Sequence, residues 1–325
     1  MRGVSLGTGA FENRETLQNF PPTIIGVIGN VFKASVFLTI FLYYKFKIKI
    51  RVFEIANYSF LVYFILESFL MGSRSTPVFY SVLTLLILMH FGKIKIKLKY
   101  LILLLSLGIA FFVVLTEVYI SRTVEFMETR ERAIEFILMK GSYMDYTNLD
   151  KGFVKFVLSL DSYYLQSFFV GLASFLAYYL HSVVEYSYLL DHFDSSARMG
   201  THTFFVITKF FEIILGIYDG RTYEYIPRLG KYTTFFGDIY MDFKYFSLVF
   251  MLFFGFWQAQ LYKRAVNKNG FAIIPLLLFL CMLNFIFPVF NLISGGNGLY
   301  LIVGFLILNF VYRLLSHINF SNSAG

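Results

Sequence analysis

Long apolar runs separated by short basic loops constrain this chain more than any other feature. The sequence is 58% hydrophobic with a mean hydropathy of +0.67, and only 15% of its residues are charged, against about a quarter in soluble proteins. A run of about 20 apolar residues is long enough to cross the hydrocarbon core of a bilayer. The sequence therefore predicts an all-α polytopic membrane protein, folded as a single integral membrane domain over residues 1–325.

Seven apolar runs are predicted to cross the membrane. They cover residues 24–44, 53–71, 78–91, 100–120, 245–261, 271–290 and 299–315. Two shorter apolar segments, 164–180 and 203–217, lie within the interval 121–243, which carries eleven Lys and Arg against fifteen Asp and Glu. We expect this interval to form a large extracytoplasmic loop, with the two segments as interfacial or re-entrant helices, because short charged segments suit the interface better than the bilayer core.

Three clusters of Lys and Arg set the predicted orientation. They lie at residues 45–51, 93–99 and 263–268, each beside the end of an apolar run. Because cytoplasmic loops carry an excess of Lys and Arg, all three are predicted to be cytoplasmic. This pattern accounts for the net charge of +8 without a nucleic-acid partner. It also places the N-terminus outside without a visible signal peptide, so we expect that one or more N-terminal helices are missing from this sequence.

Three arginines are candidate phosphate ligands. Arg74 and Arg122 stand at the mouths of predicted spans, and Arg228 lies among Tyr and Thr residues. Each guanidinium can hold a phosphate or pyrophosphate with two parallel hydrogen bonds, or can simply meet lipid headgroups as an interfacial residue. No P-loop, GxGxxG, GxSxG or Cys/His metal spacing is present, and we expect no metal or cofactor.

Two residues are candidates for a general base. Asp242 follows Tyr240 just before a predicted span, where a carboxylate is costly unless it is paired or functional. Pairing with Lys231 or Lys244 is the structural alternative. His181 ends an apolar segment, and its ordinary pKa near neutrality suits proton transfer, although a hydrogen-bonded interfacial histidine is the commoner case.

Four motifs in order resemble a known family. They are GSR at 72–74, YLHSVVEYSYLL at 179–190, THTF at 201–204 and TTFFGDIYMDFKYFS at 233–247. With these motifs, the chain from residue 22 to its C-terminus resembles the oligosaccharide repeat-unit polymerases, or O-antigen polymerases, of the Wzy type. It departs from that family in being short and in having Lys244 where a Gly is usual.

The resemblance implies a GT-C-like helical bundle and a metal-independent membrane glycosyltransferase in the bacterial inner membrane. Such an enzyme polymerises undecaprenyl-pyrophosphate-linked repeat units into O-antigen, capsule or exopolysaccharide on the outer face of that membrane. Its pathway partners are a chain-length regulator and a flippase. On this basis Asp242 or His181 is expected to be catalytic. The expected substrate-binding residues are Arg74, Arg122, Arg228, Tyr179, Thr234 and Tyr240.

Three other functions are compatible with the residues. An O-antigen ligase would transfer finished polymer onto a lipid A core. A non-enzymatic lipid-linked oligosaccharide transporter would concentrate polar groups at the middle of the membrane, and Lys33 and Glu67 are the residues that favour it. The third is a structural subunit of a polysaccharide export complex, which the polar cluster at 221–243 disfavours.

Overall fold

The protein is helical throughout the part of the chain that the structure describes. This computed structural model describes residues 24–70, 75–95, 97–141, 144, 149–217, 226–227, 234–266, 271–294 and 297–322, and none of these forms a β-strand. The all-α prediction is confirmed. The first helices are α2 Ile24–Phe32, α3 Ala34–Lys45, α4 Arg51–Leu70, α5 Ser75–His90, α6 Leu98–Met127, α7 Arg130–Lys140 and α8 Lys151–Leu158. They are followed by α9 Tyr163–His192, α10 Phe205–Leu215, α11 Phe235–Phe243, η2 Lys244–Phe246, α12 Ser247–Val266, η3 Phe271–Ile273, α13 Ile274–Ile286 and α14 Asn297–Asn322.

Four helical stretches of the described residues are long and apolar enough to cross a bilayer. They are Ile24–Lys45, Ser106–Met127, Tyr163–His192 and Phe235–Val266. Three apolar helices are shorter: Thr76–His90, Phe271–Ile286 and Gly298–Leu314. The 20 residues of α4 extend about 30 Å, but several of them are charged. This set of helices is compatible with a polytopic membrane protein.

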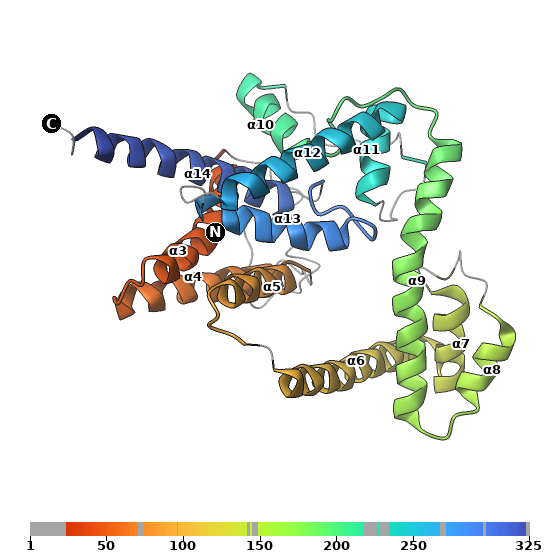
Figure 1. The fold of residues 1–325 in the computed structure, drawn as a ribbon. Coiled ribbons are helices and arrows are strands. Elements are labelled where there is room, and N and C mark those ends of the chain that lie inside the picture. The colour runs from red at the N-terminus through yellow and green to blue at the C-terminus, as the bar shows by residue number, and fades with distance from the viewer. Residues whose placement is uncertain are drawn as a thin grey trace.

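The helices form two groups that α9 joins (Figure 1). The larger group contains α2–α5 and α12–α14, and its most deeply buried large side chains include Phe37, Phe279 and Phe305. The smaller group contains α6, α7, α8 and the first half of α9, packed around Ile134 and Leu138. The second half of α9 lies beside α11.

A close helix crossing holds the smaller group together. At Gly171 of α9, an added Cβ would lie 2.3 Å from Thr116 Oγ1 and 2.8 Å from the Phe112 ring of α6. Such distances are shorter than van der Waals contact, so only glycine lets the two helices approach this closely.

The three basic clusters meet at one end of the larger group. The Lys45 ammonium lies 5.3 Å from the centre of the Phe271 ring, and the Lys93 ammonium lies 5.2 Å from that of Tyr44. Phe271 follows closely after the basic end of α12, which carries Lys263. The predicted common side of the clusters is therefore confirmed, and we call it the basic end. Its cytoplasmic location stays a prediction.

The described residues of the interval 121–243 are largely helical, and the location of this interval outside the membrane stays a prediction. The predicted short segment 164–180 is wrong in length: α9 has 30 residues, about 45 Å, and can cross a bilayer by length and composition. The error arose because His181, Ser182 and Glu185 end the apolar run, yet all three are buried on one face of α9. The segment 203–217 contains the 11-residue α10, about 16 Å long, which is too short to cross alone.

Candidate functional site

The chain reverses between α11 and α12. The Phe235 and Phe254 ring centres are 5.5 Å apart, and those of Phe243 and Phe250 are 5.2 Å apart. In one uninterrupted helix, Phe235 and Phe254 would be separated by about 28 Å. The apolar stretch Phe235–Val266 therefore consists of two helices packed against each other, and α11 is a short helix folded back onto the start of α12.

Lys244 makes this reversal. Its backbone φ is +51°, a conformation that favours glycine and costs other residues about 1–2 kcal/mol. The Lys244 ammonium donates a 2.6 Å hydrogen bond to the Phe193 carbonyl and lies 4.1 Å from the centre of the Phe193 ring. These contacts offset part of the backbone cost. They also direct the ammonium to Phe193, so the alternative that Lys244 pairs with Asp242 is wrong. Lys231 lies outside the described residues.

Two carboxylates lie one turn apart on α11 and are almost completely buried. Asp238 is 1% exposed and Asp242 is 0% exposed. Asp238 Oδ2 accepts a 2.8 Å hydrogen bond from the Asn291 side-chain amide, and Asp238 Oδ1 lies 3.3 Å from His202 Nε2. His202 is itself 4% exposed. A carboxylate beside an imidazole can orient the ring and stabilise its protonated form, so this pair can accept a proton.

Asp242 holds the turn that carries His202. Its Oδ1 accepts the backbone N–H of His202 at 2.9 Å, and its Oδ2 accepts that of Thr203 at 2.7 Å. The Asp242 backbone carbonyl also accepts the Met199 N–H. Because both carboxylate oxygens are occupied by the turn 199–203, the geometry gives Asp242 a positioning role and places Asp238 and His202 together.

The predicted residue His181 lies on α9 at the same end of the larger helix group. It is fully buried, and its Nδ1 lies within hydrogen-bond distance of the Tyr178 carbonyl. The neighbouring Ser182 hydroxyl donates to the carbonyl of Pro288, three residues before the Asn291 that binds Asp238. His181 thus neighbours a residue that contacts the segment before Asn291, and it lies on a different helix from the two carboxylates.

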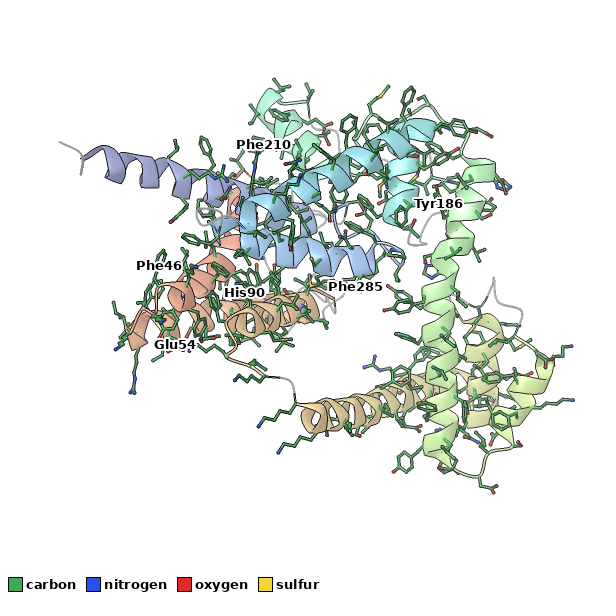
Figure 2. The ribbon with its side chains drawn as sticks, in the orientation of Figure 1. Phe46, Glu54, His90, Tyr186, Phe210 and Phe285 are labelled. Atoms are coloured by element: carbon green, nitrogen blue, oxygen red, sulfur yellow. The ribbon has the colours of Figure 1, made fainter. Side chains whose placement is uncertain are left out.

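The remaining predicted residues differ in their placement. Thr234 caps α11, since its hydroxyl accepts the Gly237 N–H at 2.9 Å, a common stabilising arrangement. Tyr240 is 6% exposed and packs near the ring of Tyr186, which Figure 2 labels on the part of α9 beside α11. Tyr179 is 44% exposed and its ring lies against Phe175.

Of the three predicted phosphate-binding arginines, Arg122 alone lies among the described residues. Arg122 is exposed on α6, in the smaller helix group. Arg74 and Arg228 lie outside the described residues. The part of the chain that the structure describes also contains no group of three or more His, Cys, Asp or Glu side chains arranged to hold a metal ion.

Sequence reasoning missed Asp238, His202 and Asn291. The i, i+4 spacing of Asp238 and Asp242 places both on one helix face, and this spacing was visible in GDIYMDF. His202 lies in the THTF motif, which the resemblance had already singled out. Asn291 was not detectable, because its contact with Asp238 joins residues 53 positions apart.

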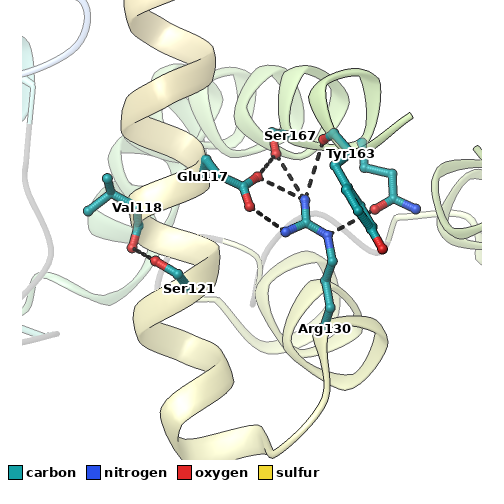
Figure 3. Close-up of polar contacts among 7 residues, drawn as sticks. Glu117, Val118, Ser121, Arg130, Tyr163 and Ser167 are labelled. Atoms are coloured by element: carbon teal, nitrogen blue, oxygen red, sulfur yellow. Dashed lines mark hydrogen bonds and ion pairs between the residues drawn. The ribbon is translucent and has the colours of Figure 1, made fainter. Parts of the chain in front are cut away.

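A second polar network, which the sequence did not predict, lies in the smaller helix group (Figure 3). Arg130 of α7 binds both carboxylate oxygens of Glu117 on α6, one of them at 2.8 Å. Its guanidinium also donates to Gln166 Oε1 and Ser167 Oγ of α9 at 3.1 Å each. The Ser167 hydroxyl donates to Glu117 as well. This closed network joins three helices, and its Arg130 neutralises the negative charge that Glu117 places within a long apolar helix.

The chain matches no known protein-family profile, no curated protein and no solved structure.

Proposed function

We propose that this protein is a membrane glycosyltransferase that polymerises undecaprenyl-pyrophosphate-linked oligosaccharide repeat units, as its motifs suggest. The observation that carries the proposal is the buried group of Asp238, Asp242 and His202 on the reversed helix and its adjoining turn. Carboxylates within a membrane bundle are costly and are usually functional. Short, broken helices that line such sites are typical of membrane proteins that act on polar substrates.

The site lies at the end of the bundle opposite to the basic end. The short helix η3 starts close to the basic end at Phe271, and α13 continues from it to Ile286. The segment after it contacts the site through Phe287, whose carbonyl accepts the Phe235 N–H, and through Asn291. With the basic clusters predicted to be cytoplasmic, this position fits a reaction on the outer face of the inner membrane.

The chemistry needs a base and a stabilised leaving group. The acceptor sugar hydroxyl loses its proton to the His202–Asp238 pair as its oxygen bonds to the anomeric carbon of the donor glycan. The bond from that carbon to the pyrophosphate oxygen breaks, and the lipid pyrophosphate leaves with the electron pair. Arg74 and Arg228 are the proposed cationic groups that stabilise this charge. Asp242 holds His202 in position, and His181 remains the rival base.

Because Asp238 and His202 are buried, an acceptor must reach them through movement of the surrounding segments. The turn 199–203 carries His202, and it is held to α11 by the Asp242 carboxylate and by the Met199 N–H. We expect it to rearrange when the acceptor binds.

The test is incubation of purified protein in nanodiscs with lipid-linked repeat units and no nucleotide sugar. A ladder of products that differ by one repeat unit supports the polymerase. Transfer only to an added lipid A core acceptor indicates the ligase, and an unchanged substrate indicates a transporter. Lys33 and Glu67 favoured a transporter in the sequence. In the structure they form an ion pair at 2.8 Å that joins α4 to the junction of α2 and α3. Each residue thus neutralises the charge of the other, which explains both without a transport role.

A further inference from the structure

A groove runs along α4 at the basic end, away from the buried carboxylates. It has a volume of about 570 Å³, within the range of about 300–1,000 Å³ typical of small-molecule pockets. Its walls come from one stripe of α4 at positions i, i+3, i+4, i+7, i+8 and i+11, which lie on the same helix face. The lining residues are Arg51, Glu54, Ile55, Tyr58, Ser59 and Val62.

The two ends of the groove differ in chemistry. Arg51 begins α4 directly after the loop that carries the exposed Lys47 and Lys49, so three cations lie within five consecutive residues at the start of the helix. Ile55 and Val62 are 65% and 52% exposed and give the inner part an apolar surface. The groove therefore offers positive charge at the surface of the predicted membrane and apolar contact further in.

Glu54 offsets part of the positive charge at the mouth, but it is one carboxylate beside the three cations Arg51, Lys47 and Lys49. Its Oε2 accepts a 2.9 Å hydrogen bond from the Tyr43 hydroxyl, and its Oε1 accepts a 3.4 Å bond from the Tyr44 hydroxyl. Both tyrosines belong to α3, so the Glu54 carboxylate is held toward α3. Figure 2 shows Glu54 close to the end of α4 that adjoins the loop with Phe46.

The length of the groove matches one leaflet. The eleven-residue separation of Arg51 and Val62 corresponds to about 16 Å along α4, and half of a hydrocarbon core of about 30 Å is about 15 Å. A lipid with its headgroup at the basic end would thus have its acyl chain alongside the stripe down to the membrane centre.

We propose that this groove is a binding site for an anionic phospholipid of the leaflet at the basic end. The phosphate binds Arg51 with Lys47 and Lys49, and one acyl chain lies against Ile55, Tyr58 and Val62. Clusters of basic residues next to a membrane helix attract anionic headgroups, and the apolar stripe makes this site selective for a whole lipid over a free phosphate. The site is separate from the proposed glycan site and does not depend on that function.

The test is native mass spectrometry of the purified protein titrated with phosphatidylglycerol or with phosphatidylcholine. Two variants address the two ends of the groove: Arg51→Gln removes the headgroup contact, and Val62→Trp fills the acyl-chain surface. Their matched controls lie on α12: Lys263→Gln removes an exposed charge at the basic end, and Leu252→Trp enlarges an exposed apolar side chain.

We expect preferential binding of phosphatidylglycerol by the wild type, and about a fivefold weaker affinity in Arg51→Gln, the effect of one basic residue near the surface. Val62→Trp should weaken binding comparably, both controls should bind as the wild type does, and excess inorganic phosphate should not compete. The proposal would be overturned if the two lipids bound equally, or if inorganic phosphate competed with the lipid. It would also be overturned if lipid affinity fell in only one α4 variant or in neither, or if it fell equally in the α12 controls.

Discussion

The substitution Asp242→Asn separates a positioning role from a purely catalytic one. The Asp242 carboxylate accepts two backbone hydrogen bonds, from His202 and Thr203, at 0% exposure. A hydrogen bond to a charged group contributes about 1.5–3 kcal/mol. Asparagine has a single side-chain oxygen, so one of the two bonds is lost and the side-chain NH₂ faces a backbone N–H. We therefore expect a local destabilisation of about 3–5 kcal/mol.

Hydrogen exchange at the His202 and Thr203 amides measures this effect directly. Since 1.4 kcal/mol corresponds to a tenfold change in an equilibrium constant, their exchange in detergent or nanodiscs should accelerate by roughly a hundredfold or more. The matched control is Asp238→Asn, whose amide oxygen can still accept from Asn291, with an expected cost of about 1 kcal/mol. If the two amides stay equally protected in Asp242→Asn, Asp242 does not position this turn.

Three further predictions concern packing, the second polar network and orientation. Gly171→Ala should destabilise the crossing of α6 and α9 by about 1–3 kcal/mol, whereas Gly108→Ala should not, because a Cβ at Gly108 would meet open space. Equal melting temperatures of the two variants would refute the close crossing. Arg130→Lys should lower thermal stability because lysine cannot form the fork with Glu117, by about 1–3 kcal/mol; an unchanged melting temperature would contradict this. A cysteine at position 95 should resist labelling by a membrane-impermeant reagent added from outside, and rapid labelling would reverse the predicted topology.

The local signals in the sequence predicted the helices and the common end of the basic clusters. Apolar runs and clustered lysines can be recognised over a few residues at a time. Lys45 indeed lies near Phe271, and Lys93 lies near Tyr44, at one end of the larger helix group. Lys244, a departure from the family that the sequence resembles, also proved informative, because its φ is positive.

The longer-range features were not predictable in this way. The reversal of α11 onto α12 depends on contacts such as Phe235 with Phe254, which hydropathy along the chain does not reveal. The length of α9 was underestimated because buried polar residues, among them His181, look like the end of an apolar run. Asp242 was identified, but its partners were not, since the backbone amides of the turn 199–203 are invisible in a sequence.

The central claim, that the buried Asp238–His202 pair performs glycosyl transfer, is tested most directly by the product ladder of Asp238→Asn in nanodiscs. This variant keeps the acceptor oxygen for Asn291 and removes the charge beside His202. With thermal stability close to that of the wild type, it should lower the rate of ladder formation by about a hundredfold or more, without nucleotide sugar in either reaction. Ladder formation at the wild-type rate by a folded Asp238→Asn protein would contradict the claim.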